Sequence, residues 1–323
     1  MNRESVLAEL AAHQGEYISG QDLAEGLNIS RVAVWKHIEA LKEQGYDIRA
    51  VSGRGYQLAV RGGLIEAQVV QAALAGAQIG KRIIYLPRVD STNEALKRLR
   101  LEENLEEGTL LAAGTQERGK GRMGRRWESP PGGLWFSVIL QPRVPLEHIA
   151  LLSLVFALAV NQTLDQYLPV PAAIKWPNDV YAGGKKLVGI LLETSGEMDA
   201  PEYLIVGIGI NTNIGAEDIP PAMRPLCTSV LEQGGVLVSH NELLAGVLQS
   251  LDQYYRRFLE EGFSNILPEF KAKCFHLGQQ VEIQQGTRKI SGTNIDINER
   301  GHLLVDTGED IVEITTGDVH LLG

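Results

Sequence analysis

The chain has 323 residues, of which 44% are hydrophobic and 22% charged, a composition typical of globular domains and not of fibrous or disordered chains. Its formal net charge of −10 argues against a protein that coats nucleic acid or anionic lipid over its whole surface, so an anion site must be a local basic cluster. The longest apolar stretch, 149–160, is shorter than the ~20 residues of a membrane span, and the two cysteines, Cys227 and Cys274, lie far apart.

These features together predict a cytoplasmic protein of roughly two or three domains with no membrane segment, no disulfide framework and no protein-held metal. The polar, amphipathic residues 1–10 do not have the apolar core that a secretory leader requires.

The first sixty residues predict three helices. Apolar positions at helical spacing predict a helix over 3–13 that ends at Gly15. Ser19 resembles the first residue of a capping box and begins a second helix through Leu27, and Ser30 caps the third. The third helix buries one stripe, formed by Val34, Ile38 and Leu41.

Two strands, 47–51 and 56–60, follow as a hairpin, and this order of elements is that of a winged helix-turn-helix. We expect DNA contacts from four side chains on the third helix and the wing: Arg31, Trp35, Lys36 and Arg54. The alternative is a capping or dimerising domain. Residues 1–60 hold six Lys or Arg against eight Asp or Glu, and a net acidic module should bind DNA weakly unless it dimerises.

After a linker, a strand over 82–89 leads into Asp-Ser-Thr-Asn (90–93) and a helix over 94–100. Backbone N–H groups and side-chain donors gathered at a helix N-terminus suit a polar ligand head group, although the same residues are also ordinary helix caps.

The segment 116–127 lies between two predicted strands and interleaves five cations with three glycines. Glycine lets the backbone close around an anion while Arg and Lys neutralise it, so we expect a phosphate-bearing ligand. The alternatives are a solvated basic loop and a nucleic-acid contact. The segment fits neither a Walker loop nor a dinucleotide-binding fingerprint.

A helix over 146–167 precedes an apolar strand that contains Lys175. A lysine in such a strand is costly unless it meets an anion, so we expect it to point into a cleft. A hairpin follows with its tip at Gly183 and Gly184, and a further strand ends at Asn211, which we expect at the same cleft.

The remaining residues predict a long helical region over 241–273 and then a small β-barrel. The strands expected in this barrel are 280–284, 288–297, 302–306 and 311–315.

Five motifs in this order resemble those of biotin-protein ligases: DSTN (90–93), GTQERGKGRMGRRW (114–127), KWPNDV (175–180), KLVGILLE (186–193) and GIGINTN (207–213). With the winged helix in front, essentially the whole chain resembles the bifunctional form that is also the biotin operon repressor. Lipoate-protein ligases and octanoyltransferases share the catalytic fold, but are not expected to combine this loop with KWPND.

The resemblance implies a multidomain α+β protein: a winged helix-turn-helix domain (1–62), a linker (63–80), a mixed α/β catalytic domain of the biotin/lipoate ligase, class II synthetase-like type (81–274), and an SH3-like β-barrel (275–323). It implies a biotin pocket formed by Ser91, Thr92, Asn93, Gln116, Lys120, Gly121, Arg122, Trp127 and Lys175. It places ATP and the adenylate at Arg122, Arg125, Lys175 and Asn211, with Mg²⁺ on the phosphates. The family often has arginine where this chain has Lys120, and lysine cannot make the bidentate contact of arginine.

The implied reaction is ATP-dependent formation of biotinyl-5'-AMP and transfer of biotin to a lysine of a biotin carboxyl carrier protein, as in biotin-[acetyl-CoA-carboxylase] ligase. Lys175 and Arg122 neutralise the reacting anions, and Asp179 orients the acceptor amine. The adenylate also favours a homodimer that binds operator DNA. Two alternatives remain: a catalytically silent biotin-sensing repressor, and a ligase with a vestigial DNA-binding domain.

Overall fold

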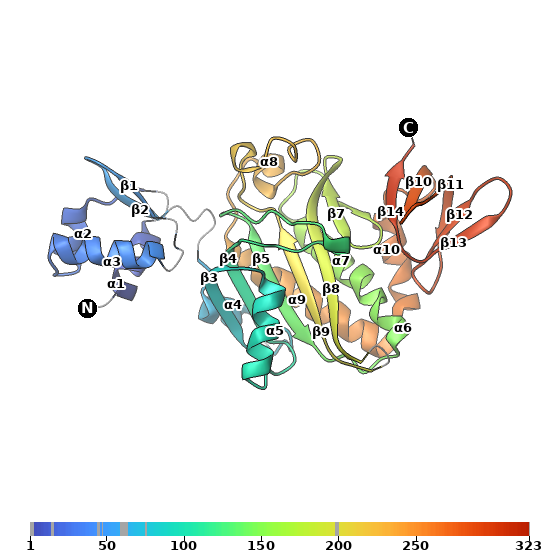
Figure 1. Cartoon of the computed structure of the whole chain (residues 1–323), viewed down its shortest axis with the longest axis horizontal. Coiled ribbons are helices and arrows are strands. Elements are labelled where there is room, and N and C mark those ends of the chain that lie inside the picture. The colour runs from blue at the N-terminus through green and yellow to red at the C-terminus, as the bar shows by residue number, and fades with distance from the viewer. Residues whose placement is uncertain are drawn as a thin grey trace.

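The computed structural model describes residues 3–13, 16–43, 46, 48–58, 64–74, 76–197 and 200–322. Three parts follow one another along the chain (Figure 1): a small N-terminal domain, a central domain built on a large sheet, and a C-terminal domain of short strands. The fold class predicted from the sequence is confirmed.

The N-terminal domain contains α1 (Arg3–Ala12), α2 (Gly20–Gly26), α3 (Arg31–Glu43) and the hairpin of β1 (Ile48–Val51) and β2 (Gly55–Leu58). Ser19 caps α2 as predicted, since its hydroxyl accepts the backbone N–H of Asp22. The predicted stripe on α3 is buried, and it packs in one core with α1, α2 and the hairpin. The predicted helix end at Gly15 and the predicted strand residues 47, 59 and 60 lie outside the described residues.

The predicted linker over 63–80 contains a helix, α4 (Ala67–Ala73), which is a correction to the sequence analysis. Val70 on α4 is 1% exposed and belongs to the core of the central domain. Asp252, on a helix of the central domain, accepts the backbone N–H groups of Gln78 and Ile79 at 2.7 and 3.0 Å. Residues 64–74 and 76–80 therefore pack as part of the central domain, because α4 has an apolar face and the backbone donors of Gln78 and Ile79 are satisfied there.

The central sheet has the strand order β3-β4-β5-β9-β8-β7-β6. Its strands are β3 (Ile83–Val89), β4 (Leu110–Gln116), β5 (Leu134–Leu140), β6 (Ala173–Lys175), β7 (Asp179–Ala182), β8 (Lys185–Glu197) and β9 (Ala200–Ile210). β3 and β4 are parallel and are joined by α5 (Thr92–Glu102), whereas the other neighbours are antiparallel. The polar turn 90–93 therefore lies at the end of β3, where α5 begins.

Helices cover the two faces of this sheet unequally (Figure 1). Behind it lie α7 (Leu151–Leu164), continuing from α6 (Leu146–Ile149), and α9 (His240–Glu261), while α5 covers part of the near face. The span Leu146–Leu164 is long and apolar enough to cross a membrane, but 67% of its window is buried inside the protein, as in a core helix. The predicted helical region over 241–273 is broken at Gly262, where φ is +77°, before α10 (Leu267–Lys273).

Alternation along the strands assigns each residue to one face of the sheet. In β5, Phe136 and Val138 join the core under α7 and α9. Ser137, between them, contacts residues of α5 on the opposite face. The near face is thus only partly covered by a helix, and polar side chains and glycines line its open part.

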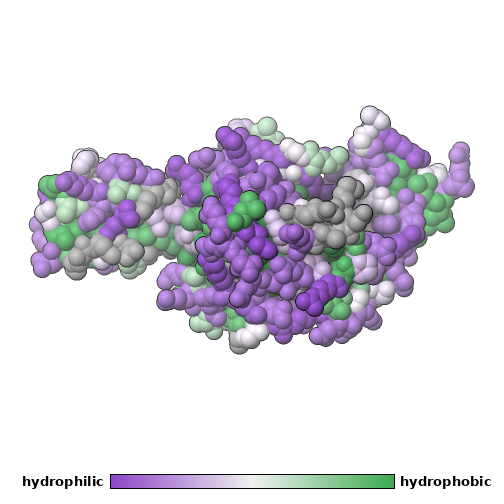
Figure 2. Space-filling model, turned by 60° about the horizontal axis from the view of Figure 1, so that its bottom comes forward, coloured by the Kyte–Doolittle hydropathy of each residue, from purple (hydrophilic) through white to green (hydrophobic). Residues whose placement is uncertain are grey.

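The C-terminal domain is an antiparallel sheet of order β13-β12-β11-β10-β14. The strands are β10 (Gln280–Gln285), β11 (Arg288–Ile297), β12 (Leu303–Asp306), β13 (Ile311–Ile314) and β14 (Asp318–Leu321). The first four were predicted from alternation, and β14 was not. Hydrophilic residues cover most of the face that Figure 2 presents.

Candidate active site

A cavity of about 550 Å³ opens on the near face of the central sheet. Every residue predicted for the reaction lines it: Ser91, Thr92, Asn93, Gln116, Lys120, Gly121, Arg122, Arg125, Trp127, Lys175, Asp179 and Asn211. The segments that the sequence separates by more than a hundred residues thus meet at one place. One half of the cavity, around the start of α5, is lined mostly by neutral polar side chains with Lys120 among them, and the other half collects Arg122, Arg125 and Lys175.

Glycines in two neighbouring strands form the floor. Gly189 of β8 and Gly209 of β9 are direct register partners. The indole of Trp127 lies against both, since a Cβ added at either glycine would stand 2.8 Å or less from that ring. Trp127 also meets Trp135 edge-on, with ring centroids 6.4 Å apart. Glycine here makes room for a flat aromatic wall.

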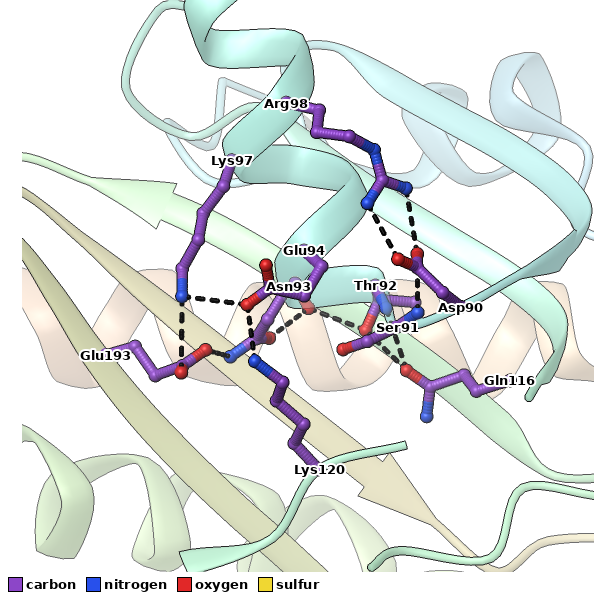
Figure 3. Close-up of polar contacts among 11 residues, drawn as sticks. Asp90, Ser91, Thr92, Asn93, Glu94, Lys97, Arg98, Gln116, Lys120 and Glu193 are labelled. Carbon is purple, nitrogen blue, oxygen red and sulfur yellow. Dashed lines mark hydrogen bonds and ion pairs between the residues drawn. The ribbon is translucent and has the colours of Figure 1, made fainter. Parts of the chain in front are cut away.

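The turn at the start of α5 supplies polar groups at one end of the cavity (Figure 3). The backbone N–H and the hydroxyl of Thr92 both donate to Oε1 of Gln116, at 2.8 and 3.0 Å. Ser137 is fully buried, and its hydroxyl lies 2.7 Å from Oγ1 of Thr92 and 2.5 Å from Oδ1 of Asn93. Ser91 occupies the N-cap position but its side chain makes no cap hydrogen bond. The turn is therefore held by Gln116 and Ser137 and not by a side-chain cap.

A chain of ion pairs connects the charged side chains at this end of the cavity (Figure 3). Lys120 pairs with Glu94 at 2.6 Å, and Glu94 pairs with Lys97 at 3.0 Å. Lys97 in turn pairs with Glu193 at 3.2 Å, and Glu193 accepts Nδ2 of Asn93 at 2.7 Å. Lys120, the position at which the chain departs from the family pattern, is thus tied to α5.

Asp90 anchors the same turn. Its carboxylate takes two hydrogen bonds from Arg98, at 2.7 and 2.8 Å, and accepts the backbone N–H of Ser91. These bonds, first that from Arg98, lower the pKa of Asp90 to about 2 despite some burial.

The cationic half of the cavity gathers side chains from three segments. Arg122 donates to Oδ1 of Asn178 at 2.7 Å and to Oγ1 of Thr316 at 3.2 Å. Arg125 forms an ion pair with Asp318 of β14. These two arginines lie on the basic loop, whose residues Arg122–Gly124 form a short 3₁₀ turn. The loop therefore contacts both the central and the C-terminal domain.

Lys175 reaches the same region from the end of β6. Burial lowers its pKa, and the charges of Asp179 and Asp318 oppose that effect. Its Nζ lies 5.5 Å from the ring centroid of Tyr181. The prediction that Lys175 points into a cleft is consistent with its place in the cavity lining.

Two other predicted residues take part in different contacts. Asp179 pairs with Lys186 at 2.6 Å, while its Oδ1 is buried without a hydrogen-bond partner among the described residues. Asn211 is 6% exposed and donates to the carbonyl of Thr228 at 2.9 Å.

Five side chains of this region were not assigned from the sequence: Ser137, Asn178, Glu193, Thr316 and Asp318. Asn178 lies within a recognised motif, and Glu193 ends another, so a signal existed for both. No local pattern indicated Thr316 or Asp318, which approach the loop from more than 190 residues away.

The expected DNA-contacting side chains lie on the N-terminal domain. Arg31, Trp35 and Lys36 are exposed on α3, and Trp35 is 54% exposed, an unusual state for an indole. Arg54, on the turn between β1 and β2, places its guanidinium 4.3 Å from the ring centroid of Tyr17.

Within the described ranges, no group of three or more His, Cys, Asp or Glu side chains gathers as a metal site. Any divalent cation at the cavity would depend on a ligand for most of its oxygen atoms.

Comparisons with known proteins match all three parts of the chain. Residues 85–211 match the model of the Biotin/lipoate A/B protein ligase family, residues 2–57 match an HTH domain, and residues 276–322 match the Biotin protein ligase C terminal domain. The bifunctional ligase/repressor BirA of Bacillus subtilis is 35% identical over 98% of this chain and 97% of its own length. That of Escherichia coli is 31% identical over 95% of this chain and 94% of its own.

Among solved structures, the biotin protein ligase from Aquifex aeolicus in complex with biotin and ATP is similar with a TM-score of 0.66 and 37% identity. The similarity covers 75% of this chain and 99% of that one.

Proposed function

This chain belongs to the family of bifunctional biotin-protein ligases and transcriptional repressors, and we propose that the cavity on its central sheet is where biotin and ATP react. It is an ATP-dependent biotin-[acetyl-CoA-carboxylase] ligase with a DNA-binding repressor domain. The observation that carries the assignment is a single cavity in which neutral polar side chains and the Trp127 indole adjoin a cluster of cations.

Biotin occupies the mostly neutral half in this proposal. Its ring system lies against the indole of Trp127, and its polar ring atoms meet Ser91, Thr92, Asn93, Gln116, Lys120 and Gly121. Its carboxylate points to Lys175 and Arg122. The polarities match: the indole is an apolar wall for the rings, hydrogen-bonding side chains meet their edges, and cations meet the acid.

ATP occupies the cationic half. Arg122, Arg125 and Lys175 contact the phosphates, and Asn211 contacts the nucleotide side of the adenylate. A Mg²⁺ ion bound together with ATP would neutralise part of the phosphate charge, and Arg122, Arg125 and Lys175 would neutralise the rest.

The first step needs no general base. A biotin carboxylate oxygen attacks the α-phosphorus, the bond to the β-phosphate oxygen breaks, and pyrophosphate leaves. Two anions must approach each other, so holding them in line and neutralising them supplies most of the rate enhancement. Lys175 lies where both meet.

In the second step the amine of an acceptor lysine attacks the carbonyl carbon of the adenylate, and AMP leaves. That amine must first lose a proton, because its pKa in water is ~10.4. Asp179 orients the amine, and the support is its partnerless Oδ1 beside the cavity.

The repressor activity uses the exposed face of α3. Arg31, Trp35 and Lys36 enter the major groove of operator DNA, while Arg54 contacts phosphate. Adenylate-dependent homodimerisation brings two such modules to one site. The acceptor is a biotin carboxyl carrier protein domain, and the reaction takes place in the cytoplasm.

The test is transfer of labelled biotin to a carrier domain with ATP and Mg²⁺. Lys175→Ala should lower the transfer rate at least about a hundredfold, because a desolvated cation at the reacting anions is lost. Lys81→Ala is the matched control, since Lys81 is exposed on the same domain and should leave the rate unchanged. Equal rates for a folded Lys175→Ala variant and the wild type would remove Lys175 from the mechanism.

A further inference from the structure

The carboxylate of Asp318 lies beside the cations that the proposed function assigns to ATP. Asp318, the first residue of β14, accepts a hydrogen bond from Nη2 of Arg125. It lines the same cavity as Arg122 and Lys175, and both of these cations act on its charge. Burial opposes ionisation of Asp318, but Arg125 first, and then Lys175 and Arg122, hold its pKa below the usual value.

Two contacts join the C-terminal domain to the basic loop. Arg122 donates to Thr316 and Arg125 donates to Asp318, so each arginine has one bond to the short segment 316–318. Arg122 keeps a further bond to Asn178 of the central domain, but Asp318 is the one ion-pair partner of Arg125 among the described residues. Arg125 is therefore the loop cation that the C-terminal domain holds most directly.

This ion pair occupies one of the donors of Arg125, at Nη2, that a phosphate could use. An arginine presents a fixed fork of N–H groups, and a carboxylate and a phosphate oxygen bind it in the same way. A polyphosphate placed at Arg122, Arg125 and Lys175 would bring negative charge beside the carboxylate of Asp318. Two negative groups in one cavity repel each other, and this repulsion weakens the binding of the polyphosphate.

We propose that Asp318 is an internal counter-ion of the ATP site: it neutralises the basic loop in the ligand-free protein and competes with the polyphosphate for Arg125. The inference rests on the proposed function, because it takes ATP to be the ligand of these cations. The C-terminal domain thereby tunes ATP affinity and holds the loop in place until the nucleotide arrives.

Asp318→Asn tests the proposal, because asparagine keeps the shape of the side chain and removes its charge. At saturating biotin, the KM for ATP should fall about fivefold to tenfold, which corresponds to about 1–1.4 kcal/mol, while the KM for biotin stays constant. Asp318→Glu keeps the charge and should have a KM for ATP close to that of the wild type. Glu309→Gln, an exposed change on the turn between β12 and β13, is the control for the loss of one charge.

A second measurement reports on the loop itself. Trypsin cleaves after Lys and Arg, and the segment 118–126 holds five of them. Ligand-free Asp318→Asn should be cut there several times faster than Glu309→Gln, and biotin with ATP should protect both equally.

The outcomes separate the two proposals. A KM for ATP that is unchanged or raised in Asp318→Asn overturns the counter-ion role, and a raised value would mean that Asp318 orients Arg125 for the phosphate instead. If the wild type transfers no biotin at all, the proposed function fails before Asp318 is tested.

Discussion

Burial and neighbouring carboxylates shift the pKa of Lys175 in opposite directions. Burial at the end of β6 disfavours its charged form, while Asp179 and Asp318 favour it. A bound carboxylate and phosphates would add to the favourable side. A lysine in this position therefore interacts more strongly with anionic ligands than an exposed lysine would, because water competes less for its charge.

His276 links the same strand to the C-terminal domain. It is fully buried, its Nε2 accepts the backbone N–H of Trp176 at 2.9 Å, and Nδ1 lies 2.9 Å from Nδ2 of Asn294. Burial, and then the charge of Lys175, lower the pKa of His276 to about 4. The folded protein thus keeps this histidine neutral where an unfolded chain would begin to protonate it.

The first prediction at this scale concerns pH. An unfolded histidine binds a proton below a pH of about 6.5, whereas His276 does so only below about 4, so the unfolded state binds more protons between these values. The free energy of unfolding should therefore fall as the pH drops from 6.5 to 4, by at most about 3 kcal/mol from this group.

Urea unfolding at several pH values measures this effect. His276→Gln keeps a hydrogen-bond acceptor but cannot titrate, so it should reduce the dependence of the unfolding free energy on pH. The substitution His148→Gln, at an exposed position, should not. Equal pH dependence in the wild type and His276→Gln would contradict the assignment.

At the scale of elements, glycine spacing in β9 decides where the cavity forms. Gly207 and Gly209 alternate with Ile208 and Ile210, so at this end of the strand one face is apolar core and the other has no side chains. A Cβ at Gly207 would meet Oδ1 of Asn93 at 2.3 Å. The strand can therefore approach both the turn before α5 and the indole of Trp127 only because these positions are glycine.

The helix α4 supports a second prediction, about which domain it belongs to. Val70→Ala should lower the free energy of unfolding of the central domain by about 2 kcal/mol, since it removes two buried methyl groups and leaves a cavity. Val69→Ala, on the same helix but at a position that is 50% exposed, should change it by less than about 0.5 kcal/mol. Chemical unfolding followed by tryptophan fluorescence measures both; if both substitutions had no effect, α4 would be a linker.

At the scale of the whole molecule, charge sets a condition on DNA binding. Residues 1–60 carry two more acidic than basic side chains, and much of the affinity for DNA comes from phosphate neutralisation. A single module should then bind weakly, and two modules in one dimer should bind much more tightly.

The prediction is that biotin with ATP converts the protein from monomer to dimer in sedimentation velocity and raises its affinity for operator DNA in parallel. Lys36→Ala should dimerise normally yet bind the operator more weakly and with a smaller dependence on salt. An identical oligomer with and without the two substrates would exclude this form of regulation.

The order of the three domains and the positions of most helices and strands could be predicted from the sequence. The sequence also indicated the main cavity residues, because glycine-basic and KWPND-type segments carry their chemistry within a few positions. The spacing of apolar residues is a local property. A spacing of three to four residues correctly predicted the buried stripe of α3, and alternation correctly predicted the first four strands of the C-terminal domain.

The contacts between distant segments could not be predicted from the sequence and are seen only in the folded protein. In isolation, residues 63–80 look like a linker rich in Ala, Gln and Gly. α4 becomes part of the core because it packs against α9, and Asp252 of α9 accepts the backbone N–H groups of Gln78 and Ile79. Asp318 lies in the short, unpredicted strand β14, and nothing near it in sequence indicates that Arg125 is its partner. Such pairings depend on how whole domains pack, since the energy of a contact between residues 193 positions apart leaves no trace in the local pattern of either segment.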